Sequence, residues 1–205
     1  MINNRETRAE RTEPLELENC VTAEEAAKLL SFAKTVIPSS TNEESEDSQV
    51  HYLYNRPDAW DPDGVIDKIQ IAFREFIKET YYLSGILEPK FFAIIRSDEL
   101  QGRKEMYSHF ESGEGETFYT GYMTLNTQRE DYVGGDNLYV NDGRGFTSLP
   151  GTLHVHRNED GNSWEISPVH VGTRYDVLVV VTERQVRARY DEFEIEQTVD
   201  DGVEY

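Results

Sequence analysis

The sequence of 205 residues contains a single cysteine, Cys20. One cysteine cannot form an internal disulfide framework, and it cannot supply the ligands of a cysteine-based zinc site. No run approaches the roughly 18 consecutive apolar residues of a membrane-spanning helix. Residues 1–14 are charged and have no apolar centre, which is not the pattern of a signal peptide. We therefore expect a protein of a reducing compartment, the cytoplasm, with no membrane partner.

Basic residues are also scarce, because 20 lysines and arginines face 40 aspartates and glutamates and the net charge is −20. Such a charge repels the phosphates of DNA and RNA, so we expect no nucleic-acid partner. A basic protein or a cationic substrate is one explanation for the charge, and solubility is another. The acidic residues are spread along the chain, which favours solubility.

The length suits one domain with a substantial core. Residues 1–14 are polar and predict a disordered N-terminal segment. Residues 15–184 carry the apolar patterns of a folded domain, and residues 185–205 form an acidic C-terminal tail. Residues 38–48 are an acidic stretch that predicts a solvated connecting loop.

Two segments carry helix signals. Thr22-Ala23-Glu24-Glu25 is a capping box, and the apolar spacing that follows predicts a helix as far as Ile37. Asp61-Pro62 marks a second helix start, and apolar residues at helical spacing continue to Tyr81. The apolar stripe of this second helix predicts that it packs on the back of a sheet.

The remainder of the chain predicts strands. Residues 91–96 read as a buried strand, and from Met106 onward short strands alternate with turn signals. The last two strands, 164–169 and 173–182, predict a hairpin around Gly172. Short strands at regular spacing favour a jelly-roll or barrel.

His109 and Glu111 stand two residues apart on a predicted extended segment. Side chains at this spacing point to the same side of a strand, so both could bind one metal ion. Several landmarks follow in a set order, namely Leu125-Asn126, Gly134-Gly135, Pro150-Gly151 and the run Pro168-Val169-x-x-Gly172-x-Arg174.

With these landmarks, the chain from about residue 15 to 184 resembles the Fe(II)/2-oxoglutarate-dependent oxygenases, nearest the prolyl 4-hydroxylase-like group. The resemblance implies an α+β fold. Its centre is a double-stranded β-helix, a jelly-roll or cupin-like barrel, buttressed by two N-terminal helices.

The resemblance also implies an iron site. Such a site needs two histidines and one carboxylate on one face of the metal. His109 and Glu111 match the first two ligands, whereas Trp164 stands where the distal histidine belongs, and an indole cannot bind iron. His156, whose strand leads into the loop before Trp164, is the candidate third ligand. An ordinary strand position is the alternative for His156.

The co-substrate 2-oxoglutarate needs a buried cation, and Arg174 occupies the position at which the related enzymes place it. Thr124 is expected to assist Arg174. Tyr122 and Trp164 are candidate substrate-binding residues, with core packing as the alternative.

Two hypotheses follow from the resemblance. The first is a prolyl 4-hydroxylase-like oxygenase that uses Fe(II) and 2-oxoglutarate on a small-molecule or peptidyl substrate, with an atypical metal site at Trp164. The second is a non-catalytic relative that uses the barrel to bind a partner or a small carboxylate. The substrate and the oligomeric state stay open.

Overall fold

The computed structural model describes residues 15–37, 50–53, 61–98, 117–139, 143–157 and 164–184. The expected disordered segment 1–14, the acidic tail 185–205 and the acidic loop 38–48 all lie outside these residues, as do His109 and Glu111.

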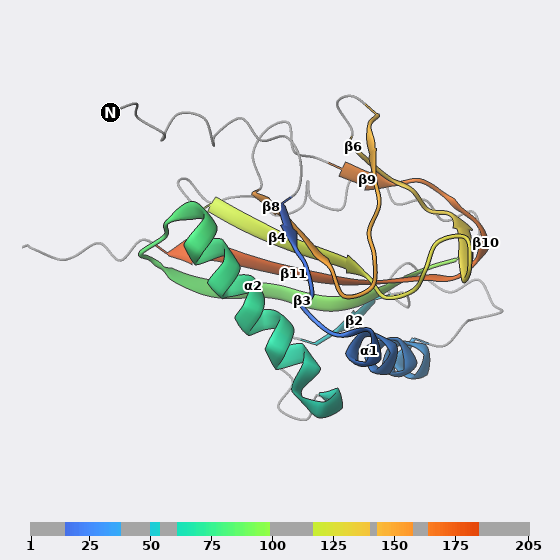
Figure 1. Cartoon of the computed structure of the whole chain (residues 1–205), viewed down its shortest axis with the longest axis horizontal. Helices are drawn as coiled ribbons and strands as arrows, with labels where there is room; N and C mark the ends of the chain where they lie inside the picture. The colour runs from blue at the N-terminus through green and yellow to red at the C-terminus, as the bar shows by residue number, and fades with distance from the viewer. Residues whose placement is uncertain are drawn as a thin grey trace, which may run out of the picture.

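The helices lie in the first part of the chain, and every described element after α2 (Val65–Tyr81) is a strand (Figure 1). The helical elements are α1 (Ala23–Val36), a short 3-10 turn η2 (Pro62–Gly64) and α2 (Val65–Tyr81). The strands are β1 (Leu15–Leu17), β2 (Val50–Tyr52), β3 (Ile86–Ser97), β4 (Thr117–Thr124), β5 (Tyr132–Gly134), β6 (Asn137–Tyr139), β7 (Gly145–Phe146), β8 (Leu153–Arg157), β9 (Trp164–Ile166), β10 (Val169–Gly172) and β11 (Arg174–Arg184).

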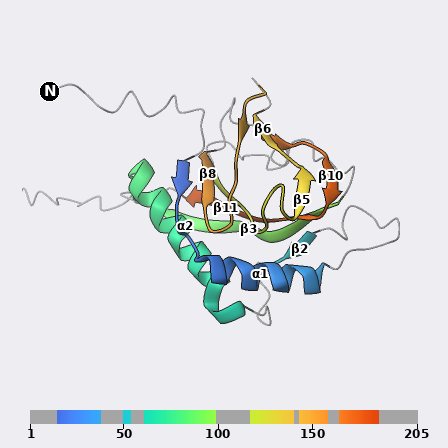
Figure 2. The ribbon, with the colours of Figure 1, turned by 45° about the vertical axis from the view of Figure 1, so that its right-hand side comes forward.

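The strands form one large sheet and two small ones. The large sheet has six strands in the order β1-β8-β4-β11-β3-β2, and the small sheets pair β10 with β5 and join β7, β6 and β9. All of these pairings are antiparallel. Both helices lie on one side of the large sheet, and the small sheets lie on the other (Figure 2). The expected combination of antiparallel sheets with two helices is therefore confirmed.

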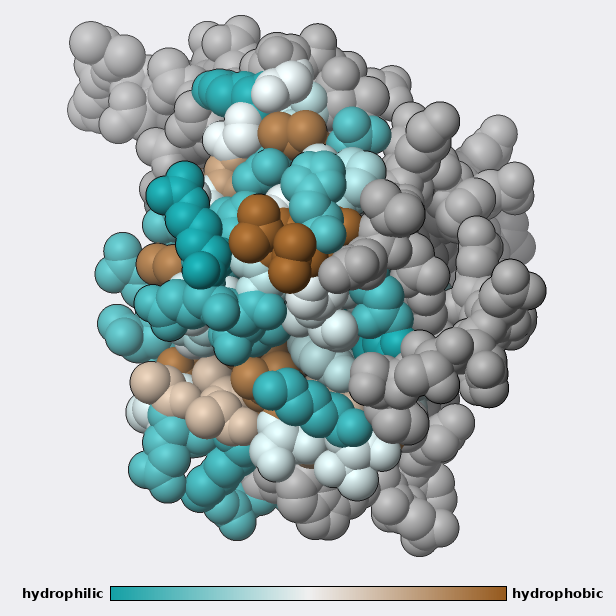
Figure 3. Space-filling model, turned by 90° about the vertical axis from the view of Figure 1, so that its right-hand side faces the viewer, coloured by the Kyte–Doolittle hydropathy of each residue, from teal (hydrophilic) through white to brown (hydrophobic). Residues whose placement is uncertain are grey.

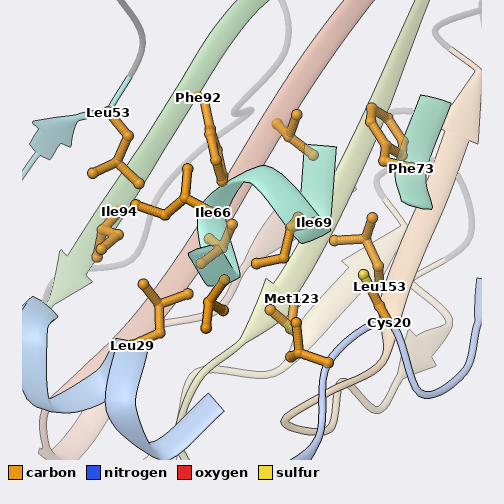
Figure 4. Close-up of a cluster of buried hydrophobic side chains, with 14 of the residues drawn as sticks. Cys20, Leu29, Leu53, Ile66, Ile69, Phe73, Phe92, Ile94, Met123 and Leu153 are labelled. Carbon is orange, nitrogen blue, oxygen red and sulfur yellow. The ribbon is translucent and has the colours of Figure 1, made fainter. Parts of the chain in front are cut away.

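Alternation along the strands divides the large sheet into two different faces. On β11, Val177 and Val179 belong to the apolar core under the helices, whereas Arg174 and Asp176 point to the opposite face. Figure 4 shows the helix side of this arrangement, where side chains of α1 and α2 meet those of β3, β4 and β8. The buried polar residues Thr124, His154, His156, Arg174 and Asp176 lie on the face toward the small sheets.

The predicted helix start at Thr22 is confirmed, whereas α2 begins at Val65, after a 3-10 turn that starts at the predicted position, Pro62. Thr22 and Glu25 form the capping box of α1, in which each side chain accepts a hydrogen bond from the other residue's backbone N–H. The Asp61 carboxylate accepts hydrogen bonds from the backbone N–H groups of Ile66 and Asp67, so it caps α2 from across the 3-10 turn. α2 then packs on the back of the large sheet, as its apolar stripe predicts.

The predicted hairpin around Gly172 is wrong. β10 pairs with β5 in a small sheet, whereas β11 lies between β4 and β3 in the large sheet. Gly172 adopts φ 82°, and a Cβ there would lie 2.5 Å from the carbonyl oxygen of Asp131. The glycine therefore marks a corner at which the chain passes from one sheet to the other, and local spacing cannot distinguish a corner from a hairpin.

Seen from the end at which β10 lies, the described surface is largely hydrophilic, with apolar side chains in small groups (Figure 3). Val133 on β5 and Val171 on β10 are among the exposed apolar residues. No described helix combines the length and the apolar character that crossing a membrane requires.

Gly121 on β4 allows α2 to approach the sheet closely. A Cβ at this position would lie 2.7 Å from Val179, 2.8 Å from Leu153 and 2.9 Å from Phe73 of α2. We predict that Gly121→Ala lowers the free energy of unfolding by about 1–3 kcal/mol, because three packed side chains must move. Urea unfolding measures the change. Gly145→Ala is the matched control, since its nearest atoms are 3.6 Å away, and an equal loss in both variants would contradict the explanation.

Candidate functional site

The described candidate residues gather in the space between the large sheet and the small ones. Tyr122 and Thr124 come from β4, Arg174 begins β11, His156 lies on β8 and Trp164 begins β9. All five are buried. The structure therefore brings together residues that lie as far as 52 positions apart in the sequence. His109 and Glu111 lie outside the residues that the structure describes.

Arg174 is fully buried, and each of its three side-chain nitrogens donates to the protein. Nε donates to both oxygens of Asp176, at 2.9 and 3.1 Å, and Nη1 donates to the carbonyl oxygen of Gly135. Nη2 donates to Asn137 Oδ1 at 2.7 Å and to Thr124 Oγ1 at 3.3 Å. Both edges of the guanidinium group are thus engaged by groups of this chain.

Asp176 is the counter-ion of Arg174 and is itself fully buried. Besides the Arg174 pair, its Oδ1 accepts hydrogen bonds from the hydroxyl groups of Tyr122 and Thr124. A buried carboxylate needs such donors, because it has lost its water. The result is a closed polar network that joins β4 and β11 to the segment around Gly135 and Asn137.

Two tyrosine rings cover this network. The guanidinium carbon of Arg174 lies 5.5 Å from the ring centre of Tyr122 and 5.8 Å from that of Tyr132. Burial raises the pKa of the Tyr132 hydroxyl well above its usual range, and the negative charge of Asp176 raises it further. Tyr132 therefore stays neutral beside the ion pair.

Trp164 fills the space next to Tyr122. It is 1% exposed, its ring centre lies 4.5 Å from that of Tyr122, and it stacks on His156 at 5.7 Å with 20° between the planes. Phe146 of β7 contacts the same indole at 5.7 Å. Trp164 is thus enclosed by aromatic side chains from β4, β7 and β8, in the manner of a core residue.

His154 and His156 point from β8 toward the same aromatic group. Within the part of the chain that the structure describes, Nε2 of each imidazole has no hydrogen-bond partner, and His154 Nδ1 lies 3.7 Å from a carboxylate oxygen of the exposed Glu16. Burial lowers the pKa of His154 to about 4 and that of His156 to about 3, and the neighbouring His154 lowers the latter further. Both imidazoles are therefore neutral near pH 7.

Some residues of the network were not found from the sequence. Asp176 stands two residues after Arg174 on the same strand, so the two-residue period that singled out His109 and Glu111 could also have placed it beside Arg174. Asn137 and the Gly135 carbonyl gave no signal, because they reach Arg174 only through the packing of one sheet over the other.

Among the described ranges, no group of three histidine, cysteine, aspartate or glutamate residues is arranged to hold a metal ion. His156 stacks on Trp164, and Phe146 packs against both His154 and His156. The expected ligand set of His109, Glu111 and His156 therefore stays a prediction.

The neutral, buried His154 predicts a loss of stability in acid. Between the unfolded pKa of about 6.5 and the folded pKa of about 4, the unfolded chain binds more protons, so the free energy of unfolding falls as the pH falls. We expect His154→Phe to remove roughly 1–3 kcal/mol of this loss between pH 6.5 and 4. Urea titrations at several pH values measure it. His170→Gln, at an exposed position, is the control, and equal pH slopes in wild type and His154→Phe would contradict the account.

Comparisons with known proteins extend this geometry. No family model matches the sequence, and no curated protein matches it. Solved structures do match. A viral collagen prolyl hydroxylase from Paramecium bursaria Chlorella virus 1, in complex with 2-oxoglutarate, is 17% identical with a TM-score of 0.64 over 83% of this chain and 96% of that one.

Two further structures agree with it. An oxidoreductase of the 2-oxoglutarate–Fe(II) oxygenase family from Burkholderia pseudomallei is 14% identical, with a TM-score of 0.59 over 85% of this chain and 87% of that one. A Trichoplax adhaerens prolyl hydroxylase, in complex with a peptide fragment of the hypoxia-inducible factor oxygen degradation domain, is 11% identical, with a TM-score of 0.62 over 89% of each chain. At these identities the likeness concerns the fold. The chain has the fold of the prolyl 4-hydroxylase-like 2-oxoglutarate oxygenases.

Proposed function

We propose that this chain is a non-catalytic protein on the prolyl hydroxylase-like fold, and that it binds a polypeptide segment instead of hydroxylating one. The observation that carries the proposal is Trp164, buried among aromatic side chains at the position that the resemblance assigns to an iron ligand.

In this proposal, the described sheets form the two walls of a double-stranded β-helix. The large sheet forms one wall, and the small sheets built from β5, β6, β7, β9 and β10 form the other. Corners such as Gly172 carry the chain between the walls. Residues that face inward from both walls, including Trp164 and Arg174, then stand where the related enzymes hold iron and co-substrate.

The residues at the metal position do not fit iron. The indole of Trp164 offers only an N–H donor and no lone pair to a metal. Its ring also takes up volume between Tyr122, His156 and Phe146, with ring-centre distances of 4.5 to 5.7 Å. A metal there would have to displace packed aromatic side chains, which is costly because protein interiors are closely packed.

The residues at the co-substrate position do not fit 2-oxoglutarate either. A carboxylate binds an arginine best through two parallel N–H donors. In this chain, Asp176, Gly135 and Asn137 accept the hydrogen bonds of Arg174. Thr124, expected to assist Arg174 in co-substrate binding, donates to Asp176. An external carboxylate would meet a negative charge already in place.

One of the fold neighbours supports a polypeptide as the ligand class. The Trichoplax adhaerens prolyl hydroxylase with the same fold is described in complex with a peptide fragment. Peptide binding on this scaffold needs a groove and hydrogen-bonding groups, and neither iron nor 2-oxoglutarate is required for it in principle. A chain that has lost the ability to bind iron and 2-oxoglutarate could thus still bind a peptide.

One observation favours a second candidate, the Fe(II)/2-oxoglutarate-dependent oxygenase with an atypical site. The buried Nε2 of His156 lacks a hydrogen-bond partner among the described residues, and its lowered pKa keeps the imidazole neutral, as a metal ligand must be. In this case His156 would complete a site with His109 and Glu111, and the substrate would be a small molecule or a peptidyl side chain.

The two candidates differ in their response to iron. We predict that the purified protein, given Fe(II) and 2-oxoglutarate without oxygen, shows no visible absorption of an iron–2-oxoglutarate chelate, and that it forms no succinate above background when air is admitted. Trp164 and the occupied Arg174 are the reasons. Anaerobic absorption spectroscopy and a succinate assay measure the two results.

A chelate band together with succinate would contradict the non-catalytic proposal. His156→Phe then identifies the ligand, because Phe keeps the aromatic contact with Trp164 and removes the nitrogens. Loss of the band in His156→Phe would establish the second candidate, whereas an unchanged band would place the third ligand elsewhere.

A further inference from the structure

We propose that Asp176 is an internal carboxylate ligand of Arg174. With the Asp176 carboxylate bound to the guanidinium group, the native protein binds no external carboxylate at this position. The inference rests on the proposed function and deepens it, since it explains how the position expected to hold 2-oxoglutarate has been filled by the chain itself. It also assigns Asp176 and Arg174 a role for which neither iron nor oxygen is needed.

The first support is the number of donors that remain. Of the three nitrogens of Arg174, Nε donates to Asp176, Nη1 to Gly135 and Nη2 to Asn137 and Thr124. A carboxylate that approached either edge of the guanidinium group would have to replace at least one of these acceptors. Asn137 and Gly135 would then lose a hydrogen bond in a buried place, which is unfavourable.

The second support is electrostatic. Arg174 and Asp176 are both 0% exposed, so their charges balance each other where water cannot screen them. A second carboxylate beside Arg174 would lie close to Asp176 and would leave one uncompensated negative charge in the interior. Like charges at such distances in a protein interior strongly disfavour joint ionisation.

The third support is that Asp176 is held by more than the arginine. The hydroxyl groups of Tyr122 and Thr124 also donate to its Oδ1. These bonds fix the carboxylate in one orientation from β4. Asp176 is therefore a built part of the site, and its removal leaves a space lined by donors that suit a small carboxylate.

The test is chemical rescue. In Asp176→Ala, Arg174 keeps its charge but loses its counter-ion, and we expect the thermal unfolding midpoint to fall by about 10 °C. Sodium acetate or formate should then restore part of this fall, and sodium chloride at equal ionic strength should not. Isothermal titration should show acetate binding to Asp176→Ala and none to the wild type.

Two comparisons make the result specific. The double variant Arg174→Met/Asp176→Ala removes both charges, so acetate should not stabilise it. The wild type, which needs no substitution, should show no heat of binding with acetate or with 2-oxoglutarate. If Asp176→Ala does not fold, the wild-type titration still decides the matter.

Binding of either carboxylate to the wild type as tightly as to Asp176→Ala would overturn the inference. Equal acetate rescue of the double variant would also overturn it, because the anion would then act elsewhere. Acetate needs no iron, so this test and the iron test of the proposed function can fail independently of each other.

Discussion

The buried Arg174–Asp176 pair is the interaction on which the interior of this protein depends. A guanidinium group with no exposure must satisfy its donors within the protein, and here the acceptors come from β11, from β4, from β6 and from Gly135 between β5 and β6. The pair therefore ties the large sheet to the small ones.

Trp164 imposes the second constraint on the same space. Its indole packs against Tyr122, Phe146 and His156, so the interior beside the ion pair is filled by aromatic rings. Tyr122 belongs to both groups, because its ring contacts Trp164 and its hydroxyl binds Asp176. The positions that the resemblance assigns to the metal and the co-substrate are therefore linked through one side chain, which is consistent with the proposal that this chain lacks oxygenase chemistry.

Sequence patterns predicted the structure correctly where it depends on residues close together in the chain. The capping box at Thr22, the Asp61 cap and the apolar stripe of α2 each depend on residues a few positions apart, and each was predicted. The pairing of β10 with β5, and of β11 with β3 and β4, is non-local, so the spacing around Gly172 gave a hairpin in error. Arg174 was located through ordered landmarks, but its acceptors at Gly135 and Asn137 depend on how two sheets meet.

We propose that the chain's own side chains occupy the positions at which the related enzymes hold iron and 2-oxoglutarate. The most direct measurement is the structure of a crystal grown with excess Mn(II) and 2-oxoglutarate, with anomalous data collected at the manganese edge. The account predicts no manganese peak beside Trp164 and an Asp176 carboxylate still bound to Arg174. A manganese peak between the sheets, with 2-oxoglutarate on Arg174 and Asp176 displaced, would contradict it.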